Sequence, residues 1–393
     1  MSKEVGLPTV SFGGAEQPVQ MPLDTNAPRK AQALESASGT DIRAEYGTEV
    51  QVPFDNGIGV SGQGEGHGNA LSAASSEGDE KAVQMLLDKG VDAQDGFLDR
   101  ALLAATIRGH ERVVRMLLDK GADANASGGL YGNPLQTASS SGFEEVIRML
   151  LEAGANVNTQ GGHYGNALQA ASSQRHKEVV KLLLSNDADV NAQGGHYGNA
   201  LHAASFEGHE DVVSILLDNG ADIDEPGPGS VTALQAASFR GHENVVQVLL
   251  GRGADVDAPS GQCGPVLQAA SYGGNERVVQ MLLDRGATFN TLEEEYGKAL
   301  HAASYKEHES VVRLLLDKGS LEANIEERQK SYDKALQAAS FRGNKEIVHM
   351  LLEKGANVNS EGGIFGNSLK AALSGGHGDL VRILLDKGAN INA

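Results

Sequence analysis

The chain has 393 residues, of which 40% are hydrophobic, a formal net charge of −20 and a single cysteine, Cys263. An acidic surface repels nucleic acid and anionic membranes, and one cysteine excludes an internal disulfide framework. No apolar run is long enough to span a bilayer, and the first residues hold none of signal-peptide length. We therefore expect an intracellular protein, cytoplasmic or nuclear, that binds neither nucleic acid nor membranes.

The first 66 residues differ from the rest of the chain, because they hold half of its ten prolines. Residues 1–30 have the composition of a disordered leader. Within residues 31–66, Ala33 to Ser38 and Val50 to Gly57 weakly resemble segments that recur further along the chain. This resemblance predicts a degenerate capping repeat whose second helix is broken by Pro53. An unstructured acidic leader is the alternative.

From residue 67 to residue 393 one segment recurs, and Gly165 to Ser172 is its clearest form. Its leucine falls at ten positions: Leu71, Leu102, Leu135, Leu168, Leu201, Leu234, Leu267, Leu300, Leu336 and Leu369. Seven of the nine intervals are 33 residues, and the others are 31 and 36. We expect the shortened connection near Gln94 to Gly96, and the insertion within Glu322 to Ser331, to lie in loops between helices. A constant period of this length predicts stacked repeats.

Each repeat has the pattern of a helix, a loop, a second helix and a projecting turn. Asn166 is a favourable N-cap, and Gln169 three residues later predicts a reciprocal capping box. The first helix is short and rich in alanine. Val179, Val180 and Leu183 then recur at helical spacing and predict an apolar face on the second helix. One repeat buries too few large side chains to offset its backbone entropy, so repeats must stack.

The residues of this pattern resemble the ankyrin repeat over residues 67–393. The resemblance rests on the 33-residue period and on the segments Gly208 to Leu217 and Gly241 to Leu250. It implies an all-α ankyrin-type solenoid of about ten helix-loop-helix units with projecting hairpin turns, and protein binding on the concave face. The Gly-Gly-x-Tyr-Gly turn, as at Gly161 to Gly165, is similar to arrays of filamentous fungi that are often attached to NTPase-type sensors.

The sequence offers no catalytic, cofactor or metal site, so we expect a protein that is not an enzyme and binds no small-molecule substrate. Histidines do recur at six equivalent loop positions: His110, His176, His209, His242, His308 and His377. Stacked helices lie roughly 8–10 Å apart, whereas a zinc ligand lies about 2.1 Å from its metal. We therefore expect these histidines to bond to neighbouring backbone.

One feature of the sequence is not explained by the repeat pattern. The residue after Ala-Ala-Ser is aromatic in five successive repeats, at positions that we call the aromatic stripe: Phe206, Phe239, Tyr272, Tyr305 and Phe341. The rings either pack repeats together or bind a partner, since aromatic residues dominate interface hot spots. As an interface they should be exposed and about 10 Å apart. Three turn tyrosines, Tyr131, Tyr164 and Tyr197, either brace the turns or form a second contact row.

Two hypotheses of function follow. The first is a monomeric, non-catalytic scaffold or adaptor that binds a partner protein on the concave face. The second is a sensor or regulatory segment of a larger NTPase-type or other multidomain protein.

Overall fold

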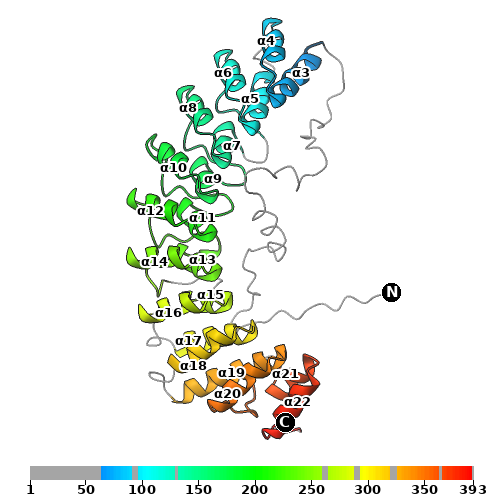
Figure 1. Ribbon diagram of the computed structural model, residues 1–393, viewed down its shortest axis with the longest axis vertical. Coiled ribbons are helices and arrows are strands. Elements are labelled where there is room, and N and C mark those ends of the chain that lie inside the picture. Colours follow the sequence, from blue (N-terminus) through cyan, green and yellow to red (C-terminus); the bar gives the residue numbers. More distant parts are fainter. Residues whose placement is uncertain are drawn as a thin grey trace, which may run out of the picture. The chain divides into compact units, whose positions relative to one another are not determined.

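The computed structural model describes residues 63–90, 96–128, 132–258, 264–286, 293–318, 325–362 and 365–391 (Figure 1). The leader proposed for residues 1–30 and most of the capping repeat proposed for residues 31–66 lie outside these residues. The same is true of Tyr131, Cys263 and the shortened connection near Gln94.

The described residues form twenty α-helices that pair in chain order into ten helix-loop-helix repeats (Figure 1). The pairs are α3 (Gln63–Glu77) and α4 (Glu80–Asp88), α5 (Phe97–Arg108) and α6 (Glu111–Asp119), α7 (Pro134–Ser141) and α8 (Glu144–Glu152), α9 (Ala167–Ser173) and α10 (Lys177–Leu184), α11 (Ala200–Glu207) and α12 (Glu210–Asp218), α13 (Ala233–Arg240) and α14 (Glu243–Gly251), α15 (Val266–Gly273) and α16 (Glu276–Asp284), α17 (Glu293–Tyr305) and α18 (Glu309–Lys318), α19 (Ile325–Arg342) and α20 (Lys345–Glu353), and α21 (Ser368–Ser374) and α22 (Gly378–Asp386).

Pairing outside these helices is confined to the projecting turns. Four antiparallel bridges close turns of the described chain: Gly128 with Gly132, Gly161 with Gly165, Gly194 with Gly198, and Gly362 with Gly366. A single turn of 3-10 helix, η2 (Pro228–Ser230), occupies the turn before α13.

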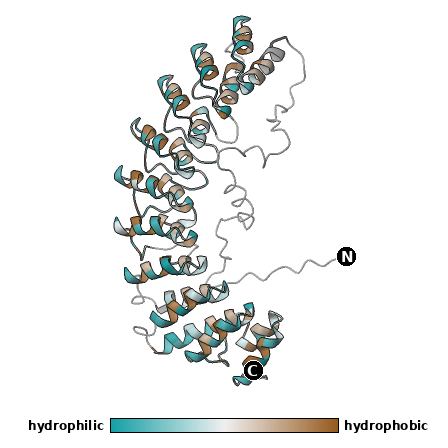
Figure 2. Cartoon of the chain, in the orientation of Figure 1, coloured by the Kyte–Doolittle hydropathy of each residue, from teal (hydrophilic) through white to brown (hydrophobic). Residues whose placement is uncertain are grey.

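The described helices fall into two compact units. The smaller contains residues 63–138 and 143–156, and the larger contains residues 139–142 and 157–391. Within the larger unit each first helix contacts its own second helix and the first helix of the next pair, from α9 to α21. The second helices form a parallel row, in which α10, α12 and α14 turn hydrophobic faces inward and hydrophilic faces outward (Figures 1 and 2).

Small residues of the first helices and branched residues of the second helices form the core. Ala170 and Ala171 of α9 and Val180 and Leu183 of α10 are fully buried. Alanine lets neighbouring first helices approach closely, while each buried Leu or Val contributes roughly 1.5–3 kcal/mol. The second-helix face predicted from the spacing of Val179, Val180 and Leu183 is therefore confirmed.

The N-caps match the sequence prediction only in part. Asn166 caps α9, because its Oδ1 accepts from the backbone N–H of Gln169 at 2.8 Å. The prediction that Gln169 bonds back to the cap residue was wrong. The Gln169 Nε2 donates instead to the carbonyls of Ala192 at 3.1 Å and Gly198 at 3.2 Å. These carbonyls of the next turn lie within reach, so the amide links two repeats. The full capping box forms at Thr232 and Gln235 instead.

The insertion in Glu322 to Ser331 was expected in a loop, and this expectation was wrong for the described part. Residues from Ile325 belong to α19, which has 18 residues where α21 has 7. Glu326, Glu327 and Lys330 are strong helix formers, and the Lys330 ammonium lies 3.3 Å and 2.7 Å from the two carboxylates. The insertion thus extends a first helix.

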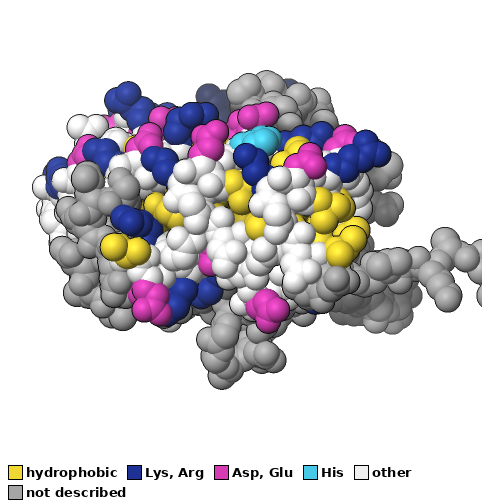
Figure 3. All heavy atoms as spheres, turned by 90° about the horizontal axis from the view of Figure 1, so that it is seen from below, with side chains coloured by type: hydrophobic (Ala, Val, Ile, Leu, Met, Phe, Trp, Pro, Cys, Tyr) yellow, Lys and Arg dark blue, Asp and Glu magenta, His cyan; other side chains and the backbone are white. Residues whose placement is uncertain are grey.

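The far end of the larger unit leaves apolar side chains exposed (Figure 3). Leu373 of α21, Leu385 of α22 and Ile391 are exposed to 60%, 37% and 73%. In internal repeats the residues equivalent to Leu385 are covered to a greater degree by a neighbour, as Leu250 is, at 6%.

Candidate partner-binding face

The aromatic stripe lies at the C-terminal ends of five successive first helices of the larger unit, α11, α13, α15, α17 and α19. Each ring keeps part of its surface exposed, and Tyr272 is the most accessible, at 38%. None of the five stripe residues is therefore fully buried or fully exposed to solvent.

Two of the four neighbouring pairs of stripe rings lie closer together than the predicted spacing of about 10 Å. The ring centroids of Phe239 and Tyr272 are 5.8 Å apart, and those of Tyr305 and Phe341 are 6.4 Å apart with an interplanar angle of 5°. Phe341 also stacks on Phe365 at 4.3 Å. The side chains lean along the stack and cover one another's edges, which shortens the distance that the helix spacing sets. Packing between repeats therefore accounts for part of the stripe.

Cations from the following repeat lie on three of the rings. The Arg240 guanidinium is 4.8 Å from the centroid of Phe206, and the Lys306 ammonium is 4.3 Å from that of Tyr272. The Arg342 guanidinium lies 5.5 Å from the centroid of Tyr305. Each cation directly follows a stripe residue in the sequence, and the ring on which it lies belongs to the repeat before. This cation–π arrangement was not predicted from the sequence.

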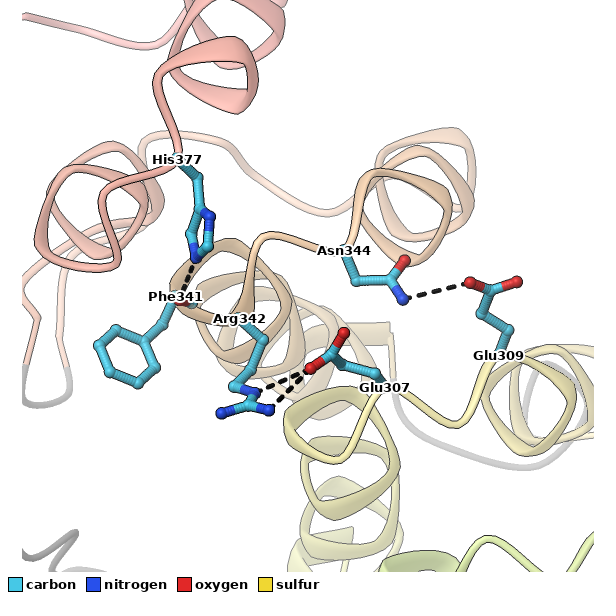
Figure 4. A network of polar contacts seen from close by, with 6 residues as sticks. All are labelled: Glu307, Glu309, Phe341, Arg342, Asn344 and His377. Carbon is cyan, nitrogen blue, oxygen red and sulfur yellow. Dashed lines mark hydrogen bonds and ion pairs between the residues drawn. The ribbon is translucent and has the colours of Figure 1, made fainter.

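The loop histidines hold the backbone beneath the stripe. Nε2 of His242 lies 2.9 Å from the carbonyl oxygen of Phe206, and the same contact joins His308 to Tyr272 at 3.0 Å. His377 repeats it with Phe341 at 2.9 Å (Figure 4). The prediction that loop histidines bond to neighbouring backbone is thus confirmed. Burial lowers the pKa of His242, and the contact with the Phe206 carbonyl partly opposes this shift.

A glycine lies beneath the His242 ring, whereas Arg175 takes the equivalent position beneath His209, at φ 61°. Gly208 ends α11 with φ +81°, and a Cβ there would lie 2.5 Å from Nδ1 of His242. Glu307 occupies the equivalent position after α17 at φ 65°, in the left-handed region that glycine favours. The Glu307 side chain instead accepts from Nε and Nη2 of Arg342, at 3.0 and 2.8 Å (Figure 4).

Two buried histidines lie behind the stripe, and sequence reasoning assigned them no role. His202 stacks on Phe206 with ring centroids 6.5 Å apart, and His301 stacks on Tyr305 at 6.4 Å. Burial is the main cause that lowers the pKa of each to about 4. The signal in the sequence was their position, because other repeats carry glutamine there, as at Gln169 and Gln235.

The turn tyrosines are tied to their own repeats. The Tyr197 hydroxyl donates to Glu207 at 2.7 Å, and the Tyr164 hydroxyl accepts from Gln174 Nε2 at 3.3 Å. Burial, together with the Glu207 carboxylate, raises the pKa of Tyr197. At the turn tips the rings of His163 and His196 stack at 5.2 Å. These contacts favour bracing over partner binding for Tyr164 and Tyr197.

Comparison with known families matches the family described as "Ankyrin repeats (3 copies)" at residues 70–161, 130–194, 168–260, 266–362 and 321–393. The chain therefore belongs to the ankyrin-repeat family, and the predicted all-α solenoid of about ten repeats is confirmed. Proteins of this family are in general protein–protein interaction modules and are typically non-catalytic.

Among solved structures, the chain is similar to the crystal structure of the human ASB11 ankyrin repeat domain. The two are 28% identical, with a TM-score of 0.49, over 55% of this chain and 96% of that one. Comparison with curated protein sequences finds no match.

Two further findings concern the described part of the chain. None of its helices combines the length and the apolar character needed to cross a membrane. Its histidine, cysteine, aspartate and glutamate side chains form no cluster of three or more that could hold a metal ion.

Proposed function

We propose that the chain is a non-catalytic scaffold or adaptor that binds a partner protein through the aromatic stripe. The observation that carries the proposal is the partial exposure of Tyr272 between the Phe239 ring and the Lys306 ammonium. Aromatic residues and arginine are enriched in interface hot spots, and soluble proteins rarely expose contiguous apolar surface without a use. Recognition of this kind requires no cofactor, metal or small-molecule substrate.

The proposal takes the chain to act as a monomer inside the cell, in the cytoplasm or the nucleus, without binding nucleic acid or membranes. A regulatory segment of a larger NTPase-type or other multidomain protein would use the stripe in the same way, since the bound partner would then be another domain. Tyr164 and Tyr197 are a second and weaker set of candidate contacts, and Tyr131, which lies outside the described residues, stays a candidate from its sequence alone.

The test is the double variant Phe239→Ala/Tyr272→Ala. Both rings are partly exposed, so we expect each truncation to cost about 1–2 kcal/mol of stability, below the roughly 3–5 kcal/mol of a fully buried Phe. A thermal melt measures this cost. Affinity purification with mass spectrometry should then show that the variant loses partners that the wild type retains.

Ile325→Ala/Leu385→Ala is the matched control, because both side chains are exposed, at 74% and 37%, and lie outside the stripe. It should retain the partners. If the Phe239→Ala/Tyr272→Ala protein unfolds at a much lower temperature, or captures the same partners as the wild type, the stripe serves packing alone and the proposal fails.

A further inference from the structure

Several cations on or directly after the second helices of the larger unit pair with carboxylates of neighbouring repeats. Arg252 pairs with Asp218 at 2.8 Å, and Lys354 pairs with Asp317 at 3.0 Å. Lys318 lies 3.7 Å from Asp284 in the same way. The repeat spacing thus brings opposite charges of adjacent second helices together, while Arg313 and Arg382 form no ion pair of this kind with a described residue.

Two cations at the stripe lie on aromatic rings and not beside carboxylates. Arg240 and Lys306 lie on the rings of Phe206 and Tyr272, and neither forms an ion pair with a described residue. Two cations without a carboxylate partner among the described residues therefore lie on rings of the stripe.

The carboxylates beside the stripe are already engaged. Glu207 accepts a hydrogen bond from the Tyr197 hydroxyl at 2.7 Å. Glu307 pairs with Arg342 (Figure 4). Of the three cations that lie on stripe rings, Arg342 is therefore the one that forms an ion pair with a described carboxylate. Glu207 keeps its negative charge, so the stripe is apolar with a small positive excess, +3 from Arg240, Lys306 and Arg342 against −2 from Glu207 and Glu307, on a chain whose net charge is −20.

We propose that the stripe recognises an acidic segment of the partner protein, one that also carries an apolar side chain. This rests on the proposed function of the stripe and names the chemistry of what it binds. Carboxylates of the segment would accept from the donors of Arg240 and Lys306, since a guanidinium on a ring face keeps its N–H edges free. The apolar side chain would lie against Phe239 and Tyr272, between these two cations.

The acidic remainder of the chain limits the range of this attraction. At physiological ionic strength charges more than about 8 Å apart on the surface are largely screened, so the cations in contact decide binding. A bound acidic segment should therefore dissociate in ~1 M salt, where the screening length falls to about 3 Å.

The experiment is fluorescence anisotropy with a fluorescein-labelled peptide of alternating glutamate and phenylalanine. Peptides in which lysine or serine replaces glutamate, and a single-stranded oligonucleotide of equal charge, are the comparison probes. The wild-type chain should bind the glutamate peptide most tightly. Arg240→Glu/Lys306→Glu should weaken this binding at least about tenfold, with an unchanged circular dichroism spectrum.

Arg313→Glu/Arg382→Glu is the matched control, because it makes the same change of charge at exposed positions of α18 and α22. It should leave binding of the glutamate peptide within about twofold of the wild type. An equal loss in this control would show that net charge alone decides binding and would overturn the inference.

The inference also fails if the lysine peptide or the oligonucleotide binds as tightly as the glutamate peptide, or if the wild type binds none of the probes. If the serine peptide binds equally well and Phe239→Ala/Tyr272→Ala abolishes that binding, the stripe remains a protein-binding surface without a preference for acidic partners. The partner capture described under the proposed function is judged separately.

Discussion

At the scale of single residues, the repeats are joined by contacts in which one side chain serves its neighbour's backbone. His242 illustrates this, since its ring covers Gly208 and bonds to the carbonyl of Phe206. Where histidine is replaced, as by Asn275, the amide still reaches the Phe239 carbonyl, at 3.5 Å. The carbonyls of four stripe residues are thus bound by the next repeat, whereas at Tyr305 the equivalent Asn344 bonds to Glu309.

Glu307 provides a test of backbone strain at one residue. Its φ of 65° costs about 1 kcal/mol for a residue with a Cβ, whereas glycine adopts it freely. Both Glu307→Ala and Glu307→Gly lose the exposed ion pair with Arg342, which is worth at most about 1 kcal/mol. We therefore expect the glycine variant to be more stable than the alanine variant by about 1 kcal/mol in urea unfolding. Equal stabilities would contradict the strain.

The buried histidines predict how stability depends on pH. The pKa of His202 and of His301 is about 4 in the folded chain and returns to about 6.5 on unfolding. The unfolded chain therefore binds more protons between these values, so the free energy of unfolding falls as the pH is lowered through this range. Between about pH 7 and pH 5.5 we expect a loss of about 1 kcal/mol for each histidine.

Urea unfolding at the two pH values measures this loss. The variant His202→Gln/His301→Gln is the control, because glutamine is the residue of the equivalent positions Gln169 and Gln235. Its stability should vary less with pH, by about 2 kcal/mol over the same interval. An unchanged pH dependence would show that these two rings titrate normally in the folded chain.

At the scale of elements, the sequence predicts helices well wherever local chemistry decides them. Asn166 was recognised as an N-cap, and the spacing of Val180 and Leu183 predicted the buried face of α10. The greater length of α17 and α19 was not predicted, because the helices were placed from the pattern that all repeats share. The signal was present: α19 begins with helix formers such as Glu326 and Lys330, without the glycines of a turn.

The projecting turns are joined by asparagine side chains, and Asn158 tests their contribution. Its Oδ1 accepts from the Asp189 N–H at 2.8 Å, and its Nδ2 donates to the Asp187 carbonyl at 3.0 Å. Asn158→Ala removes both bonds and should cost about 1–3 kcal/mol. Asn158→Asp keeps the acceptor, as Asp224 does toward the Asp255 N–H at 3.0 Å, and should cost less.

Urea unfolding of the two Asn158 variants measures the difference. If the aspartate variant is as unstable as the alanine variant, the bond to the Asp189 N–H contributes nothing, and the turns are held by packing alone.

At the scale of the whole molecule, the repeat period predicts the fold and the positions of the stripe residues. It does not predict which side chains contact the stripe. The positions of Phe239 and Tyr272 follow from counting residues. Their separation of 5.8 Å, and the cation on Tyr272, depend on how side chains lean across a repeat boundary. Spacing along the chain carries no information on that direction. The cations on the rings of Phe206 and Tyr305 likewise required the structure.

The central claim is that the stripe, and not the second-helix face, meets the partner. Site-specific photo-crosslinking tests it most directly, with a benzophenone amino acid placed at Tyr272 or Tyr305 and, for comparison, at the exposed Gln247 of α14 or Arg313 of α18. We expect crosslinks to one partner protein from both stripe positions and none from the other two. Crosslinks from Gln247 and Arg313, with none from the stripe, would contradict the account.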